Sequence, residues 1–306
     1  MKSFLSIQDC SSEQLKELLA LSRDLKALYK SGKRDICLSG KVLAMLFEKA
    51  SLRTRVSFQV AMVDLGGTAI YLKPEDIGII GKREPAKDMA RVFARYVDCI
   101  MARTFSHETI LELDRWSHEP IINALSDWSH PCQAMADILT IREHCGDLTG
   151  LKLAYIGDGN NVARSLAFAC AKFNMQFVCA SPKGYELDAE TLTTANTMLA
   201  DCATQTHDPI EAVAGAQIVY TDTWTSMGQE EESERRRRVF AQMQVNRELV
   251  AQAAADVLVM HCLPAHRGEE ITDEVMDSPN SIVFDQAENR LHVQKGIMVF
   301  LHCRQE

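Results

Sequence analysis

The stretch that decides the fold is VLAMLFEKASLRTR, residues 42–55. Its first six residues are apolar, which is typical of a strand that is buried on both faces of a parallel sheet. A helix is expected over residues 52–65, and Ser51 stands where a capping residue is needed. The stretch therefore predicts a strand, a short loop and a helix, which is how a βαβ unit begins.

The same alternation of apolar runs and helical patterns continues along the chain. Before residue 146 we expect strands at 42–47, 68–72, 99–102 and 121–124, and helices at 11–30, 52–65, 85–96, 107–117 and 129–145. A second series of strands is expected at 152–157, 177–181, 218–222, 257–262 and 282–285, followed by a helix at 287–303. The pattern predicts an α/β protein with two parallel sheets.

The length agrees with two domains, because 306 residues exceed the size at which one core usually stops growing. We expect one domain at 1–146, with a C-terminal helix at 287–306 packing back onto it, and a second domain at 147–286. Each would be a parallel β-sheet flanked by helices. Ligands of such sheets bind beyond the carboxyl ends of the strands, so the active site is expected in the cleft between the domains.

Composition excludes several classes of protein. The net charge of −9 argues against a nucleic-acid or anionic-membrane partner. No apolar run approaches the roughly 18 residues of a membrane span, and the first residues lack the pattern of a secretory signal. The ten cysteines are scattered and form no C-x-x-C pair, so we expect a reduced, cytoplasmic protein without a structural metal.

An anion site is one interpretation of residues 51–55. The hydroxyls of Ser51 and Thr54, the guanidinium of Arg53 and the N–H groups of the first helical turn together suit a phosphate. A capped helix with surface arginines is the alternative, and the residues alone leave both open.

His130 and Gln133 stand at the start of the helix expected at 129–145. The imidazole could polarise a carbonyl group, and the Gln133 amide could bond to another amide. The alternative is a capping turn whose histidine faces the core.

Residues 157–161, Gly-Asp-Gly-Asn-Asn, resemble the start of a dinucleotide-binding turn. Val162 occupies the position of the third glycine, however, and no acidic residue ends the next strand near Ser181, which disfavours a dinucleotide. An asparagine at this turn could bond to the carboxylate or amine of a ligand. A plain turn is the other reading.

Two further strand ends carry polar residues. Asp222 could hold an ammonium group, with Ser226–Gly228 closing over it. Pro264 interrupts regular backbone hydrogen bonding, so the carbonyl groups of Cys262 and Leu263 could accept hydrogen bonds from the amide of a ligand. The alternative there is a nucleophilic Cys262 paired with a histidine.

The charged run at 230–238 has acidic residues first and arginines after them. Glu231 and Arg235 stand four residues apart, which is the spacing of ion pairs on a helix. We therefore expect a solvated helix face rather than a nucleic-acid patch.

In combination these segments resemble the aspartate/ornithine carbamoyltransferase family. Ser-x-Arg-Thr-Arg at 51–55, His-Pro-Cys-Gln at 130–133 and His-Cys-Leu-Pro at 261–264 follow in the order and at the separations of that family. Asp222–Gly228 is similar to the D-x-x-x-S-M-G segment of its ornithine-specific members, and Ala287–Arg290 fits too. The resemblance covers nearly the whole chain.

The resemblance implies transfer of the carbamoyl group of carbamoyl phosphate to the side-chain amine of L-ornithine, giving L-citrulline and phosphate. The reaction is shared by arginine biosynthesis and arginine breakdown, and the short chain without insertions favours biosynthesis. It implies no metal and no cofactor, and a homotrimer or a multiple of trimers with sites at subunit interfaces. The residues implied for carbamoyl phosphate are Ser51, Leu52, Arg53, Thr54, Arg103, His130, Gln133, Cys262, Leu263 and Arg290. Those implied for ornithine are Asn161, Asp222, Ser226 and Met227, and the catalytic ones are Arg53, Arg103, His130, Asp222 and Cys262.

One segment departs from the family. Relatives place a glutamine or histidine in the loop at 76–84, where it reaches the phosphate of the neighbouring subunit. Here those positions hold Gly78 and Ile79, so Lys82 would have to substitute or the contact is missing.

Other functions stay open at this point. Within the family the rival amines are putrescine, aspartate and acylated ornithine, and Asp222 with Ser226–Gly228 favours ornithine. A non-catalytic carbamoyl-phosphate-binding homologue is a rival of another class. A nicotinamide-dependent oxidoreductase is disfavoured by the missing third glycine.

Overall fold

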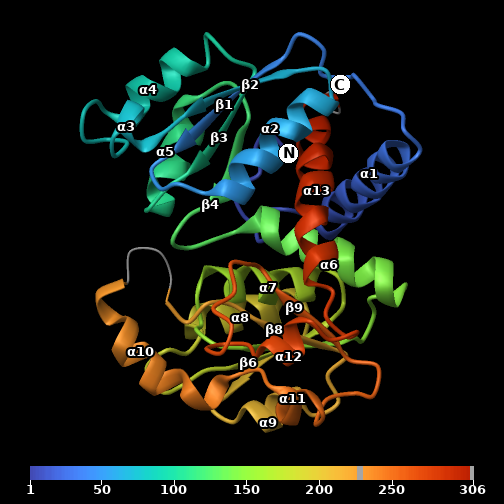
Figure 1. The fold of residues 1–306 in the computed structure, drawn as a ribbon. Helices are drawn as coiled ribbons and strands as arrows, with labels where there is room; N and C mark the ends of the chain where they lie inside the picture. Colours follow the sequence, from blue (N-terminus) through green and yellow to red (C-terminus); the bar gives the residue numbers. More distant parts are fainter. Residues whose placement is uncertain (226–229, 304–306) are drawn as a thin grey trace. The chain divides into compact units, whose positions relative to one another are not determined.

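The computed structural model describes residues 1–225 and 230–303, and the chain divides into two compact units (Figure 1). Unit 1 comprises Met1–Leu139 and Glu288–Glu306, and unit 2 comprises Thr140–Ala287. The division falls inside helix α6 (Pro131–Cys145), whereas the sequence pattern placed it after that helix. A boundary inside a continuous helix leaves no break in composition to mark it.

Unit 1 is built on a four-stranded parallel sheet of order β2-β1-β3-β4. Its strands are β1 (Val42–Phe47), β2 (Thr68–Leu72), β3 (Cys99–Arg103) and β4 (Ile121–Leu125). Its helices are α1 (Ser12–Lys30), α2 (Leu52–Asp64), α3 (Pro74–Ile77), α4 (Ala86–Phe93) and α5 (His107–Trp116), joined by most of α13 (Val283–Cys303). The four expected strands are confirmed.

The core of unit 1 forms around the two central strands. Ala44 and Leu46 of β1 are fully buried and share a cluster with Ile100 of β3. Met89 of α4 and Ile110 of α5 belong to the same cluster, so these helices cover that face of the sheet. Burying the apolar side chains of both strands stabilises the sheet whose ends carry the polar residues.

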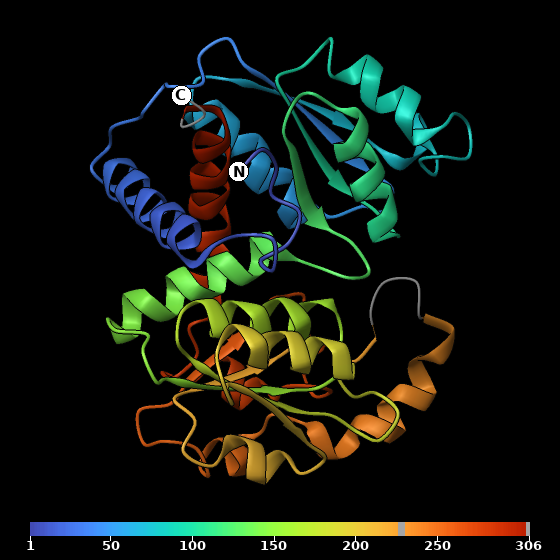
Figure 2. The ribbon, with the colours of Figure 1, turned by 180° about the vertical axis from the view of Figure 1, so that it is seen from behind.

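Helix α13 lies between α1 and α2, as both views show (Figures 1 and 2). Lys30 of α1 pairs with Glu288 at 2.6 Å, and Lys295 pairs with Asp64 at the end of α2. A Cβ atom at Gly296 would stand 2.0 Å from the Ser22 hydroxyl. Only glycine therefore allows α13 to approach α1 this closely.

Unit 2 is built on a five-stranded parallel sheet of order β7-β6-β5-β8-β9. The strands are β5 (Lys152–Ile156), β6 (Gln176–Ala180), β7 (Ala203–Thr206), β8 (Ile218–Thr221) and β9 (Leu258–His261). The helices are α7 (Asn161–Lys172), α8 (Ala189–Met198), α9 (Pro209–Val213), α10 (Ser233–Phe240), α11 (Arg247–Val250) and α12 (Asp273–Met276). Short 3₁₀ turns occur at η1 (Glu230–Glu232) and η2 (Ala241–Met243). Two parallel sheets with helices around them confirm the predicted fold class.

In this unit one strand prediction is wrong and one strand was not predicted. Residues 282–285 form no strand, because α13 already begins at Val283 and only Ser281 bridges to Val259. A short apolar run fits a strand or a buried helix equally well. Strand β7 was missed, since its sequence is polar and two of its four residues are exposed at the sheet edge.

The glycine-containing turn at 157–159 has a packing explanation. The Gly159 N–H donates to the Tyr185 carbonyl at 2.9 Å. A Cβ atom at Gly159 would stand 2.2 Å from the Leu187 backbone nitrogen. Glycine is therefore required here for the approach of two backbone segments, whether or not a ligand binds. Within residues 1–225 and 230–303, no helix is long and apolar enough to cross a bilayer.

Candidate active site

The predicted site residues fall into two groups, one in each unit. Unit 1 holds Ser51, Leu52, Arg53, Thr54, Arg103, His130, Gln133 and Arg290, and unit 2 holds Asn161, Asp222, Cys262 and Leu263. Ser226 and Met227 lie outside the described residues. Most of these side chains follow the carboxyl end of a strand, because parallel strands end at one edge of their sheet.

The first turn of α2 presents backbone N–H groups after β1. Ser51 occupies the N-cap position, but its side chain accepts no capping hydrogen bond. Its hydroxyl donates instead to the Thr54 hydroxyl at 3.0 Å. The early N–H groups of a 13-residue helix, with their partial positive charge, suit an anion. Leu52 and Arg53 are exposed on this turn.

Arg290 connects three helices of unit 1. Its guanidinium donates to the Gln133 amide oxygen of α6 at 2.5 Å and to the Thr54 hydroxyl of α2 at 3.4 Å. The Gln133 amide nitrogen donates in turn to the Asp137 carboxylate at 2.8 Å. Both ends of the Gln133 amide are thus engaged within the protein, and Gln133 holds Arg290 in place.

Three cations of unit 1, Lys49, Arg103 and Arg290, act on the same imidazole; we call them the cationic cluster. His130 is 5% exposed. Its pKa lies well below the ordinary value because of burial, followed by repulsion from Arg290, Arg103 and Lys49. His130 is therefore neutral at physiological pH.

The pKa of Lys49 is lowered for similar reasons. Burial and then the charge of Arg103 lower its pKa to about 8, and Asp127 and Glu48 offset this only in part. The ammonium also lies 5.1 Å from the centre of the Phe105 ring. A bound anion would relieve mutual repulsion of this kind, so the electrostatics of this edge of unit 1 suit a phosphate.

Glu48 ties the loops around this edge together. Its carboxylate accepts from the Ile80 N–H and from the Phe105 N–H, both at 2.7 Å. Its own N–H donates to the Arg103 carbonyl at 2.9 Å. Neither Lys49 nor Glu48 was assigned from sequence, although both lie in the quoted stretch. Lys82 is exposed on the loop that Ile80 anchors, and its contact with a neighbouring subunit stays a prediction.

In unit 2 the predicted residues gather around the Asp222 carboxylate, which is 7% exposed at the end of β8. The Cys262 thiol donates to it at 2.8 Å, and the Asn160 amide nitrogen donates to it at 3.1 Å. Asn160 also caps α7 by accepting from Val162 N–H at 2.9 Å. The contact with Asp222 therefore comes from Asn160, which was not singled out from sequence. Asn161, the residue expected to bind ornithine, is the first residue of α7.

The Cys262 segment is held from behind by His261. Its Nδ1 accepts from the Leu263 N–H at 2.8 Å, and its Nε2 lies 3.0 Å from the Glu270 carboxylate, both side chains being fully buried. The Leu263–Pro264 peptide is cis. Gln286 accepts from the His261 N–H at 2.9 Å. This arrangement gives His261 a positioning role.

Arg236 corrects the interpretation of the charged run. It is buried on α10, and its guanidinium pairs with Asp158 and donates to the Trp224 carbonyl at 2.5 Å. The ion pair at i,i+4 spacing joins Glu232 to Arg236 at 3.6 Å. The neighbouring arginines are exposed, so only part of the run is a solvated face. Arg236 fixes the start of the segment that follows Asp222.

Asp158 depends on this arginine. Burial raises the pKa of Asp158 to about 6, the Arg236 charge opposes that rise, and the Asp222 charge adds to it. Burying the ionised Asp158 carboxylate thus costs free energy in the folded protein, and the ion pair with Arg236 offsets that cost.

Replacing Arg236 by methionine is expected to lower the free energy of unfolding by about 3 kcal/mol at pH 8, because Asp158 is left as an uncompensated buried charge. The pKa of Asp158 would rise further without the arginine. Its protonation in the folded state would then reduce the loss as the pH falls toward 5. Denaturant unfolding at both pH values measures this.

Arg235→Met is the matched control, since Arg235 is exposed on the same helix, and it should change the free energy by less than about 0.5 kcal/mol. An Arg236→Met loss that is equally small, or that grows as the pH falls, contradicts this reading.

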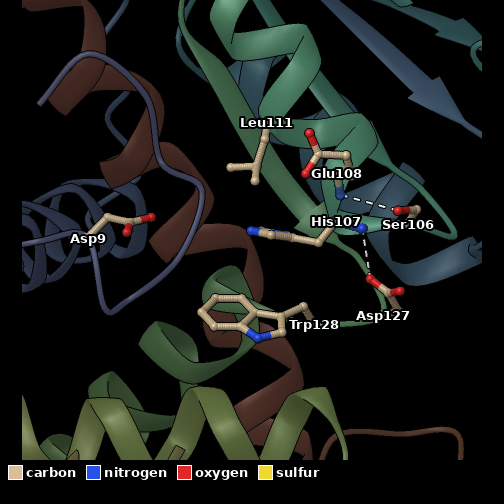
Figure 3. A pocket seen from close by; sticks show the side chains of 7 residues that line it. All are labelled: Asp9, Ser106, His107, Glu108, Leu111, Asp127 and Trp128. Atoms are coloured by element: carbon tan, nitrogen blue, oxygen red, sulfur yellow. Dashed lines mark hydrogen bonds between the residues drawn. The ribbon is translucent and has the colours of Figure 1, made fainter. Parts of the chain in front are cut away.

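A separate pocket of about 440 Å³ lies in unit 1 (Figure 3). It is lined by Asp9, Ser106, His107, Glu108, Leu111, Asp127 and Trp128. The His107 and Trp128 rings face each other with centres 4.9 Å apart. None of the predicted residues that the structure describes lines this pocket, and its three carboxylates disfavour a phosphate.

Comparison with known proteins covers both units. The carbamoyl-P binding domain of the aspartate/ornithine carbamoyltransferase family matches residues 2–143, and its Asp/Orn binding domain matches residues 149–301. Ornithine carbamoyltransferase from Anoxybacillus flavithermus is 52% identical over 98% of this chain and 96% of its own. The anabolic enzyme of Pyrococcus furiosus is 48% identical, with the same coverage.

Among solved structures, the ornithine carbamoyltransferase from Pyrococcus furiosus superposes with a TM-score of 0.96 over 100% of this chain and 98% of its own, at 48% identity. Similarity of this extent includes both units and every segment on which the sequence resemblance was based. The chain belongs to the aspartate/ornithine carbamoyltransferase family.

Proposed function

We propose that this chain transfers the carbamoyl group of carbamoyl phosphate to the side-chain amine of L-ornithine, giving L-citrulline and phosphate in arginine biosynthesis. The relatives named above carry that activity in their names, and one of them is described as anabolic. Unit 1 would bind carbamoyl phosphate and unit 2 would bind ornithine, as the names of the two matching domains suggest.

The observation that carries the proposal is the repulsion within the cationic cluster. Lys49, Arg103 and Arg290 all lower the pKa of His130, and Arg103 lowers that of Lys49. A phosphate dianion supplies the negative charge that such a group of cations favours. The N–H groups at the start of α2, with Ser51, Arg53 and Thr54, would complete its binding.

The neutral state of His130 fits the chemistry at the carbonyl group. Attack by an amine converts this group to a tetrahedral species with negative charge on oxygen. A neutral imidazole donates one hydrogen bond to that oxygen without giving up its proton. The charge of Arg103 acts on His130, and Arg103 would stabilise the same negative charge on the oxygen. Cations that contact the departing phosphate lower the barrier to its release.

Asp222 and Cys262 suit the other substrate. A free side-chain ammonium must lose a proton before its nitrogen can attack. The Asp222 carboxylate can bind the ammonium, and the Cys262 thiol at 2.8 Å can exchange a proton with it. Asn160 orients the carboxylate from the other side. Asn161, Ser226 and Met227 are proposed to bind the amino-acid end of ornithine, and Leu263 and Gln133 to contact the carbamoyl amide.

The assembly is part of the proposal. We propose a homotrimer or a multiple of trimers with sites at subunit interfaces, in the cytoplasm. The support is the family membership and the scattered free cysteines of a reduced compartment.

Citrulline formation tests the function directly. With carbamoyl phosphate present, kcat/KM for L-ornithine should exceed that for putrescine, L-aspartate and Nα-acetylornithine by at least about 100-fold, because each lacks a group that the site would bond or adds one it cannot pair. Asp222→Asn should lower kcat/KM for ornithine and leave the affinity for carbamoyl phosphate within about twofold. Equal use of putrescine, or binding of carbamoyl phosphate without any turnover, refutes the proposal.

Lys49 predicts how phosphate binding depends on pH. Because its pKa is about 8 in the free protein, the Lys49 side chain is mostly a charged ammonium below pH 8 and mostly a neutral amine above it. The Kd for carbamoyl phosphate should therefore rise between pH 7.5 and 9.5, by up to about tenfold per unit above pH 8. Isothermal titration calorimetry across this range measures the change.

Two variants separate this effect from others. Lys49→Arg keeps its charge at pH 9.5, so its Kd should stay flat across the range. Lys49→Met should bind about 10- to 100-fold more weakly than the wild type at pH 7.5 and show no slope, so the difference between the two should shrink as the pH rises. A flat wild-type profile, or a slope that persists in Lys49→Arg, excludes Lys49 from the phosphate site.

A further inference from the structure

Two of the ten cysteines differ from the rest in exposure. Cys37 and Cys303 are exposed, Cys145 and Cys262 are half-buried, and the other six are buried. All ten lie within the described residues. Buried thiols behave as small apolar side chains, so only exposed ones meet reagents in solution readily.

The two exposed cysteines are neighbours in space although 266 positions separate them. Cys37 lies in the segment between α1 and β1, and Cys303 is the last residue of α13. Cys303 is close enough to contribute, by its charge and by a side-chain hydrogen bond, to the raised pKa of Cys37. Both views show the end of α13, near the label C, beside the segment that leads into β1 (Figures 1 and 2).

Contacts on both sides fix this neighbourhood. His302 lies 3.2 Å from the Asp98 carbonyl through its Nε2, and the Asp98 carboxylate pairs with Lys41 at 2.7 Å. Leu38, next to Cys37, donates its N–H to the Leu65 carbonyl at 2.9 Å. These contacts hold the segments that carry the two thiols in place.

We propose that Cys37 and Cys303 are a redox site that forms a reversible intramolecular disulfide with a small-molecule disulfide, such as oxidised glutathione, as the oxidant. One protein thiolate attacks the oxidant, giving a mixed disulfide and one released thiol. The second protein thiolate then attacks the protein sulfur of that mixed disulfide and releases the second thiol. Two protein thiols are oxidised and one small-molecule disulfide is reduced to two thiols.

The environment of Cys37 assigns the order of these steps. Although the residue is exposed as a whole, partial burial of the Cys37 thiol itself, and then the charges of Asp35 and Cys303, raise the pKa of the thiol to about 12. Cys37 is therefore a poor first nucleophile. Once Cys303 carries the mixed disulfide, its own part in raising the Cys37 pKa is removed, while burial and Asp35 keep theirs. Cys37 then acts as the resolving thiol.

A disulfide here would fasten the end of α13 to the segment before β1. Helix α13 also carries Arg290, which holds Gln133 and Thr54. The bond would close a loop of nearly the whole chain, and long closed loops restrict the unfolded state most. The oxidised protein should therefore unfold at a higher temperature than the reduced one.

Peptide mapping of the full-length protein tests the proposal. The protein is equilibrated with mixtures of reduced and oxidised glutathione, blocked with N-ethylmaleimide and digested with trypsin without reduction. The peptides 35–41 and 296–304 each contain one cysteine. Their cross-linked product should appear with a mass two hydrogens below their sum and should disappear after reduction.

The controls make the result specific. Cys37→Ser and Cys303→Ser should each abolish the cross-link and the rise in melting temperature on oxidation, whereas Cys145→Ser should keep both. Non-reducing electrophoresis should show a monomeric chain. The proposal is overturned if the two peptides are recovered only separately, blocked or glutathionylated, or if the linkage joins two chains.

Discussion

Mutual repulsion among Lys49, Arg103 and Arg290 is the constraint on which unit 1 depends. Placing like charges near one buried imidazole costs free energy, and His130 responds by staying neutral. The fold keeps the arrangement in place through neutral contacts, since Arg290 is fastened by Gln133 and Thr54. A preorganised site of this kind attracts a dianion without rearranging during the reaction.

Unit 2 has the opposite electrostatic character around its predicted residues. Asp158 and Asp222 are carboxylates close enough for Asp222 to raise the pKa of Asp158, and burial contributes most to that rise. Arg236 compensates Asp158, which leaves Asp222 for its bonds with Asn160 and Cys262. Each unit thus presents the charge opposite to that of one proposed substrate, a phosphate dianion in one and an ammonium in the other.

The sequence predicted what local pattern determines, and it missed what distant contacts determine. Arg103 and Asp222 could be found because apolar runs mark the strands they follow and parallel strands end at one edge. Glu48 and Arg236 could not, because Ile80, Phe105 and Asp158 become their partners only in the folded chain. The strand expected at 282–285 was wrong because a short apolar run does not distinguish a strand from the start of a buried helix.

The most direct test of the electrostatic account is an NMR titration of the His130 ring in the free protein and in the presence of saturating phosphate, with a His130→Asn variant to assign the signal. In the free protein the ring should remain neutral to well below pH 6.5. Phosphate should raise its pKa, because the anion offsets the three cations that lower it. A ring that titrates near 6.5 and does not respond to phosphate would contradict the account.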